Sequence, residues 1–164
     1  HLSLALLPSA VRMLSYGDVL TLASPEGGLL QGEGLLDTRM WVRSSAEAPA
    51  DGQSCLFEVL PLQQPEEAVG HPVLYGHLIQ LRHVRSGQFV ALRERVLAHV
   101  EPDCLRVELG PSESSCWLSV QPSRASRAEG DCVRMGDGVL LLSAKSRQQL
   151  HCSPLALPDL EPRE

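Results

Sequence analysis

Aromatic side chains and lysines are scarce in this chain. Phe, Trp and Tyr make up 4% of its 164 residues, and the Gln-x-Trp repeat of ricin-type lectins does not occur. Lys145 is the single lysine, and 14 basic residues face 20 acidic ones, which gives a net charge of −6. Binding to nucleic acid or heparin needs clustered positive charge. We therefore expect no nucleic-acid partner.

Long apolar runs and catalytic signatures are also missing. No segment approaches about 18 consecutive apolar residues, so we expect no direct insertion of this domain into a membrane. The Gly-x-Ser-x-Gly elbow, the glycine-rich phosphate loop and the His-Glu-x-x-His pattern do not occur. We expect no catalytic residues, no enzymatic activity and no cofactor.

Metal-binding patterns are weak. His77 and His83 share a strand face, but no third ligand follows at a suitable spacing. Asp131 and Asp137 lie near glycines, and such pairs are more typical of turns than of a calcium loop. The sequence predicts no metal site.

The cysteines are isolated from one another. Their number is odd, they form no Cys-x-x-Cys pair, and they lie singly, at Cys55, Cys104, Cys116, Cys132 and Cys152. Such cysteines are typical of small buried side chains. Their pattern favours a reducing compartment such as the cytosol.

What the chain does contain is an internal repeat. Residues 16–22 (YGDVLTL) return as 75–81 (YGHLIQL) and as 135–141 (MGDGVLL), with steps of 59 and 60 residues between their glycines. A second marker, residues 55–61 (CLFEVLP), returns as 116–122 (CWLSVQP). Self-similarity at a fixed period indicates a repeat architecture. Three β-rich units of this size fit a closed threefold barrel.

We therefore predict an all-β fold, a β-trefoil with three repeats of ~60 residues and about eleven strands. The third repeat has no closing strand, because the period places that strand at about residue 175, beyond the last residue of the chain. The last closing strand is thus expected to be missing, which leaves a sheet edge for something else to cover.

The expected organisation has three parts. Residues 1–11 are a flexible leader, residues 12–153 are the β-trefoil domain, and residues 154–164 are an acidic, proline-rich tail. The leader is apolar but short, and it lacks the basic start of a signal peptide.

Two groups of motifs in this chain resemble motifs of known proteins, both in their order and in their spacing. Residues 74–83 (LYGHLIQLRH), the pair Cys116 and Trp117, and the motifs within 121–137 are similar to the ryanodine receptor N-terminal domain. Residues 34–39 (GLLDTR) and 55–61 are more similar to the inositol trisphosphate receptor. Over residues 12–153, the chain resembles the N-terminal β-trefoil of this family of calcium-release channels.

The resemblance implies a function without a ligand pocket. In the inositol trisphosphate branch this trefoil is the suppressor domain, which lowers ligand affinity and passes the binding signal on. The ligand itself lies between a second trefoil and a helical domain. In the ryanodine branch the equivalent domain forms a contact ring around the fourfold axis. The implied partners are neighbouring domains and subunits of a homotetrameric channel, on the cytosolic face of the endoplasmic or sarcoplasmic reticulum.

Two departures from the family pattern limit the resemblance. Only residues 61–74 join the first repeat to the second, where the inositol trisphosphate branch carries a helical arm. The final strand is also absent. The sequence leaves the choice between the two branches open.

The resemblance also implies candidate partner-interface residues. Residues 34–39 align with a loop that couples inositol trisphosphate receptors to their channel, and two leucines with a charged rim would suit docking. The alternative is that Leu35 and Leu36 plug the bottom of the barrel. The loop candidates are Gly34, Leu35, Leu36, Asp37 and Arg39.

Three further candidates come from the second repeat. Phe89 aligns with an aromatic residue linked to suppression, although a phenylalanine in a strand is more often part of the core. Arg82 and His83 could join a polar contact between subunits, although an exposed strand face would explain them equally well.

Two other classes of trefoil remain open. One is a carbohydrate-binding trefoil, ricin-like or of the MIR type attached to protein O-mannosyltransferases, which the scarcity of aromatic residues disfavours. The other is a protease-inhibitor or cytokine-like trefoil, which would require secretion.

Overall fold

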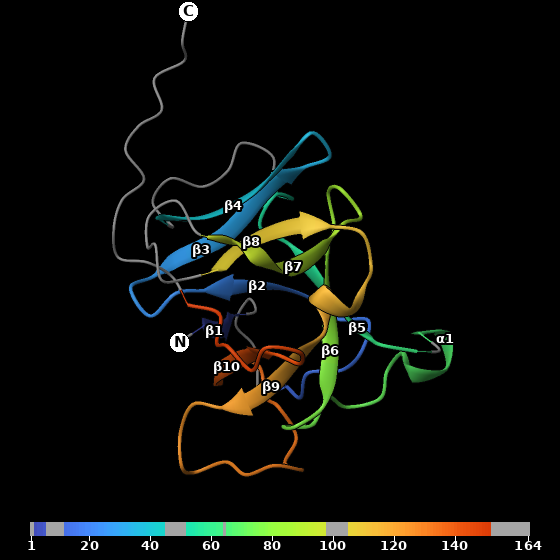
Figure 1. The fold of residues 1–164 in the computed structure, drawn as a ribbon. Helices are drawn as coiled ribbons and strands as arrows, with labels where there is room; N and C mark the ends of the chain where they lie inside the picture. The colour runs from blue at the N-terminus through green and yellow to red at the C-terminus, as the bar shows by residue number, and fades with distance from the viewer. Residues whose placement is uncertain (1, 6–11, 45–51, 64, 98–104, 152–164) are drawn as a thin grey trace, which may run out of the picture.

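A computed structural model of the chain describes residues 2–5, 12–44, 52–63, 65–97 and 105–151. Within these ranges the regular secondary structure is almost entirely β-strand (Figure 1). The strands are β1 (Leu2–Ala5), β2 (Val19–Ala23), β3 (Gly28–Gly34), β4 (Asp37–Ser44), β5 (Phe57–Pro61), β6 (Leu78–His83), β7 (Phe89–Leu97), β8 (Leu105–Gly110), β9 (Leu118–Pro122) and β10 (Gly138–Ser143). Two short helical segments, α1 (Pro65–Ala68) and η1 (Ser114–Cys116), lie in connections. The all-β prediction is confirmed.

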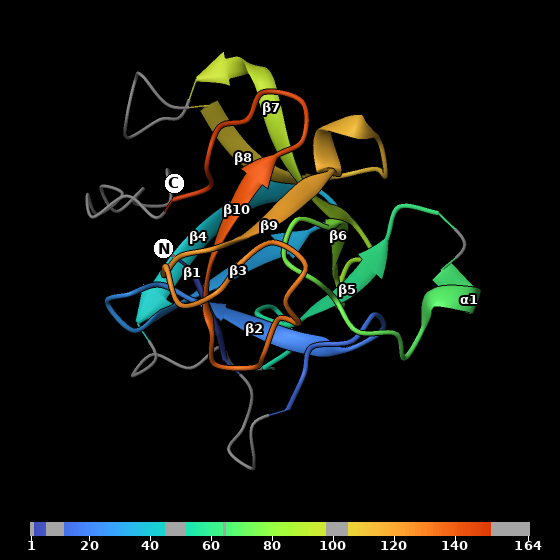
Figure 2. The same ribbon diagram turned by 90° about the horizontal axis from the view of Figure 1, so that it is seen from below.

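Six strands close into a ring (Figure 2). Each is hydrogen-bonded to two neighbours within the ring, in the antiparallel pairs β1–β2, β2–β5, β5–β6, β6–β9, β9–β10 and β10–β1. A closed barrel has no exposed edge along this ring, so every strand backbone finds partners on both sides.

The N-terminal strand β1 closes the ring. It pairs with β2 through Leu4 and Leu22, and with β10 through Leu2 and Val139. The prediction of a flexible leader is therefore wrong for residues 2–5; the rest of residues 1–11 lies outside the described part of the chain. The predicted open edge is also absent, because β1 occupies the place between β10 and β2 where the repeat would put its last strand.

Two hairpins extend from the ring. One is β3–β4 and the other is β7–β8, and a bridge between Arg39 and Glu108 joins them. A β-trefoil consists of six ring strands and one hairpin in each of its three repeats. The ring and the hairpins of the first two repeats have this arrangement here. In the third repeat, the described residues after β10 form only a single β-bridge, between Leu142 and Gln149. The full threefold trefoil therefore stays a prediction.

The internal repeat appears as a ring of three backbone hydrogen bonds. Leu14 N–H donates to the Val133 carbonyl at 2.8 Å, Val133 to Val73 at 2.9 Å, and Val73 to Leu14 at 2.8 Å. Each of the three residues precedes its repeat glycine by three positions, and all three are buried. Equivalent positions of the three units therefore meet at one end of the barrel.

The repeat glycines have a conformational role. Gly17, Gly76 and Gly136 adopt φ values of +90°, +93° and +87°, a region that side chains with a Cβ rarely enter. The N–H groups of Gly17 and Gly76 donate to the carbonyls of Val59 and Val120 at 2.8 and 2.7 Å. Gly17 and Gly76 thus tie the opening strands of the first two repeats to the closing strands of those repeats.

Tyrosines add a second link between units. The Tyr16 hydroxyl lies 3.1 Å from Nδ1 of His77, and the Tyr75 hydroxyl donates to Oδ2 of Asp137 at 2.8 Å. Burial, followed by the Asp137 carboxylate, raises the pKa of Tyr75, and burial raises the pKa of Tyr16. Both hydroxyls therefore stay protonated at neutral pH.

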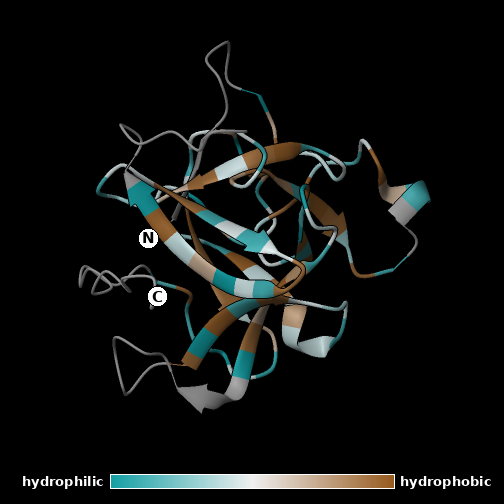
Figure 3. Cartoon of the chain, turned by 90° about the horizontal axis from the view of Figure 1, so that it is seen from above, coloured by the Kyte–Doolittle hydropathy of each residue, from teal (hydrophilic) through white to brown (hydrophobic). Residues whose placement is uncertain are grey.

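The core fills the ring and comes from alternate strand positions. Figure 3 shows hydrophobic and hydrophilic bands alternating along the strands, as expected where one face is buried. Eight aliphatic side chains meet at the centre: Leu14, Leu22, Val59, Ile79, Leu81, Val120, Val139 and Leu141. Cys55 and Cys116 are buried, as predicted, while Cys132 is partly exposed and Cys104 and Cys152 lie outside the described residues. Burial raises the pKa of the Cys116 thiol, which makes that thiol less reactive.

Candidate functional site

The most exposed apolar side chains in the described part of the chain lie at the turn between β3 and β4. Residues 34–37 form this turn, here called the leucine tip. Leu35 is 70% exposed and Leu36 is fully exposed, at 104%. The alternative that these two leucines plug the barrel is therefore wrong. Leu35 also has φ +57°, which is uncommon for a residue with a branched side chain.

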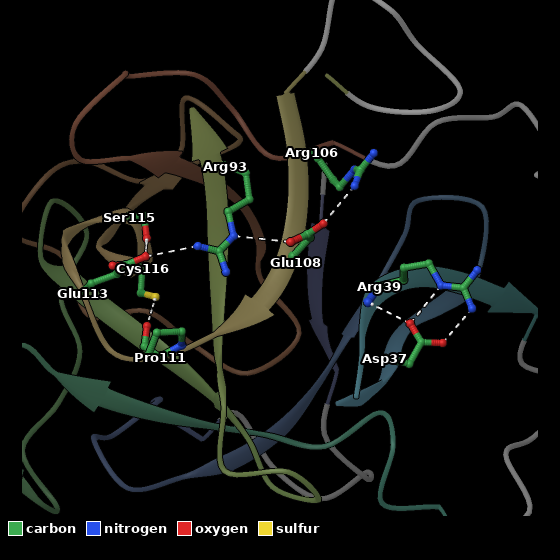
Figure 4. A network of polar contacts seen from close by, with 9 residues as sticks. All are labelled: Asp37, Arg39, Arg93, Arg106, Glu108, Pro111, Glu113, Ser115 and Cys116. Atoms are coloured by element: carbon green, nitrogen blue, oxygen red, sulfur yellow. Dashed lines mark hydrogen bonds and ion pairs between the residues drawn. The ribbon is translucent and has the colours of Figure 1, made fainter. Parts of the chain in front are cut away.

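An ion pair follows the leucines on β4. The guanidinium of Arg39 holds both carboxylate oxygens of Asp37, with Nε 2.8 Å from Oδ1 and Nη2 2.7 Å from Oδ2 (Figure 4). The backbone N–H of Arg39 adds a third contact, at 3.1 Å from Oδ1. The hydrogen bond from Arg39 lowers the pKa of Asp37, so the pair stays ionised at neutral pH. The two apolar side chains therefore have a charged rim of fixed geometry on one side.

The leucine tip rests on the turn between β6 and β7, residues 84–88. The N–H of Leu35 donates to Oε1 of Gln88 at 2.8 Å. Arg85 of this turn also forms an ion pair, at 3.3 Å, with Glu33 at the end of β3. Gly34 lies so close to Ser86 that a Cβ on Gly34 would overlap the Ser86 side chain. The site is thus built from two turns that are far apart in sequence.

The three candidates from the second repeat lie in different environments. Arg82 is exposed and forms an ion pair with Glu58 on the neighbouring strand β5. Phe89 is half-buried at the start of β7 and does not belong to the core cluster. His83 is fully buried, so the expectation that its side chain reaches a neighbouring subunit is wrong in this structure.

Sequence reasoning missed a second polar cluster on β7 and β8. Arg93 lies between two carboxylates, with Nε 3.3 Å from Glu108 and Nη1 3.2 Å from Glu113 (Figure 4). Arg106 adds a contact of 3.1 Å to Glu108. The alternation of apolar and polar residues along β8 predicts that Arg106 and Glu108 lie on one face. Arg93 and Glu113 come from other segments, so their place in the cluster could not be predicted from this pattern. The opposite charges balance, so this cluster stabilises the hairpin and offers no anion site.

Gly34 gives a direct test of the contact between the two turns. Gly34→Ala is expected to lower the free energy of unfolding by about 2 kcal/mol, because a methyl group meets Ser86 and the backbone is left-handed. Gly27→Ala is the matched control, since Gly27 has φ +89° but nothing within 4 Å of the added Cβ. It should cost about 1 kcal/mol. Equal losses in urea unfolding would show that the close approach to Ser86 has no energetic weight.

The family model described as inositol 1,4,5-trisphosphate/ryanodine receptor matches residues 62–162, more than half of the chain. The chain belongs to this receptor family. A curated relative from Caenorhabditis elegans, the inositol 1,4,5-trisphosphate receptor itr-1, is 25% identical over 103 residues, covering 57% of the chain. The chain spans only 4% of the length of that relative. The resemblance read from the sequence motifs is thereby confirmed at the level of the family.

The described residues contain no group of three or more His, Cys, Asp or Glu side chains that could hold a metal ion. No helix among them has the length and apolar character needed to cross a membrane.

Proposed function

We propose that this chain is a regulatory contact domain of a ligand-gated intracellular calcium-release channel, and that the leucine tip is its docking element. In this proposal the domain lies on the cytosolic face of the endoplasmic or sarcoplasmic reticulum. Its partners are neighbouring domains and subunits of the homotetrameric channel. Membership of the receptor family supports this assignment.

The observation that carries the docking role is the exposure of Leu35 and Leu36 in a constrained turn. Single exposed leucines are common on protein surfaces. Here two adjacent leucines are exposed, at a turn that a second turn supports, and their exposed side chains add little to the stability of the monomer. Apolar anchors with a charged rim are typical of the centre of an interface. The role is mechanical: docking differs between channel states, and ligand binding elsewhere shifts their balance.

A calorimetric titration tests this proposal. The chain is titrated into the ligand-binding core of an inositol trisphosphate receptor, with and without inositol trisphosphate. Association that depends on the ligand supports coupling, while association indifferent to the ligand favours a contact-ring role as in the ryanodine branch. No association under either condition contradicts docking to this core and favours the carbohydrate-binding alternative.

The leucine tip is tested in the same titration. The double variant Leu35→Ala/Leu36→Ala should weaken association about tenfold or more, because truncating a central apolar anchor costs on the order of 2 kcal/mol. Its melting temperature should not change, since both side chains are exposed. The control is Val69→Ala, which removes a 57% exposed apolar side chain beside α1, away from the leucine tip (Figure 1). If the unmodified chain and both variants bind with equal affinity, the leucine tip is not part of the interface.

A further inference from the structure

One position distinguishes the second repeat from the other two. Seven residues after the repeat glycines stand Ser24, His83 and Ser143, all of them buried. In the first and third repeats the serine hydroxyl accepts an N–H from its own turn, from Gly28 at 3.1 Å and from Ser146 at 3.2 Å. A small hydroxyl is therefore sufficient to cap this turn, and the histidine must be explained by something else.

The ring of His83 reaches two other segments. Nε2 lies 2.9 Å from the carbonyl oxygen of Ser54, in the connection between β4 and β5, and Nδ1 lies 2.8 Å from the hydroxyl of Ser86. A carbonyl oxygen can only accept, so Nε2 donates its proton to Ser54, while Nδ1 is paired with the Ser86 hydroxyl. The ring also packs against Phe57, with centroids 5.5 Å apart. These contacts fix the orientation of the imidazole inside the barrel.

A short series of contacts leads from His83 to the surface. The Ser86 hydroxyl also accepts the N–H of Gln88 at 3.3 Å. The side chain of Gln88 accepts the N–H of Leu35 at 2.8 Å, and Gly34 packs directly on Ser86. Ser86 and Gln88 thus link the histidine to the leucine tip, although the side chain of His83 is itself buried.

We propose that His83 is a positioning residue for the leucine tip, acting through Ser86 and Gln88. This inference rests on the docking role proposed above and names the residue that holds the docking geometry. A turn of two exposed leucines would otherwise sample many conformations, and fixing it in advance reduces the entropy lost on binding.

Two conservative variants separate the contacts of the imidazole. In His83→Asn, the side-chain amide reaches the place of Nδ1 and can keep the contact with Ser86. In His83→Gln, the amide reaches the place of Nε2 and can keep the contact with Ser54. Both variants lose the packing on Phe57, so they are matched for the damage done to the core.

The readout is solvent exchange of the Leu35 amide proton, measured by NMR on the complete chain. His83→Gln should accelerate this exchange about fivefold to tenfold, because the Ser86 contact that holds Gln88 is lost. His83→Asn should leave it within about twofold of the unmodified chain. Ser143→Ala is the control from the third repeat and should leave the exchange unchanged.

Ser86→Ala keeps the proposal testable if the histidine variants fail to fold, since Ser86 is only half-buried. It should accelerate exchange at Leu35 as His83→Gln does, and it should weaken association with the ligand-binding core by a similar factor. Unchanged exchange in His83→Gln and Ser86→Ala would overturn the proposal, and so would equal acceleration by Ser143→Ala. If the unmodified chain does not bind the core, the docking function fails, while the exchange measurements still decide the role of His83.

Discussion

Replacing Leu4 with proline is expected to lower the free energy of unfolding by on the order of 3 kcal/mol. Strand β1 has a neighbour on each side, β2 and β10, so proline removes a backbone donor from within the ring. The barrel is then left with a poorly paired gap. Urea unfolding followed by tryptophan fluorescence measures the loss.

The control for this experiment is Leu4→Val at the same position. Valine keeps the backbone N–H and favours the extended conformation, so the unfolding midpoint should change little. If Leu4→Pro and Leu4→Val unfold at the same urea concentration, β1 does not close the barrel in solution. The flexible leader predicted from the sequence would then be restored.

Replacing Phe57 with alanine is expected to cost about 3–5 kcal/mol, the range for removing a fully buried phenylalanine. The side chain is 0% exposed and supports the ring of His83. The loss should therefore appear both in urea unfolding and as faster solvent exchange at the leucine tip.

Phe89→Ala is the matched comparison, since the chain has only two phenylalanines. Phe89 is half-buried and outside the core cluster, so its loss should cost about 1 kcal/mol. If Phe89→Ala weakens association with the ligand-binding core while stability is retained, the role in suppression implied by the family resemblance gains support. Equal destabilisation by the two variants would mean that Phe89 is a core residue.

The repeat was the part of the fold most accessible to sequence reasoning. Glycines at 17, 76 and 136 recur because each turn needs a positive φ, and that requirement is local. The ring-closing role of β1 could not be found in this way. A strand of four residues acquires its partners from distant segments, and nothing in its own composition indicates which they are.

The candidate site was predicted in part. Leu35 and Leu36 were identified as a pair, but their apolar character fits a buried plug as well as an exposed tip, and only the fold decides between them. The burial of His83 could have been predicted, because it follows Ile79 and Leu81 at alternate positions of one strand. Its polar side chain suggested a surface instead. The partners of His83 lie in other segments, so its link to the leucine tip needed the three-dimensional structure.

The closure of the barrel by β1 has a consequence for the order of events during synthesis. Leu2 is synthesised long before its partner Val139. Strand β1 can pair with β2 soon after both are made, but its other side stays unpaired until β10 has emerged. Joining two such distant segments carries a large loop-closure cost, which makes the step late and slow. During that interval the unpaired edge of β1 is the place where a nascent chain of this kind would meet a chaperone or a second copy of itself.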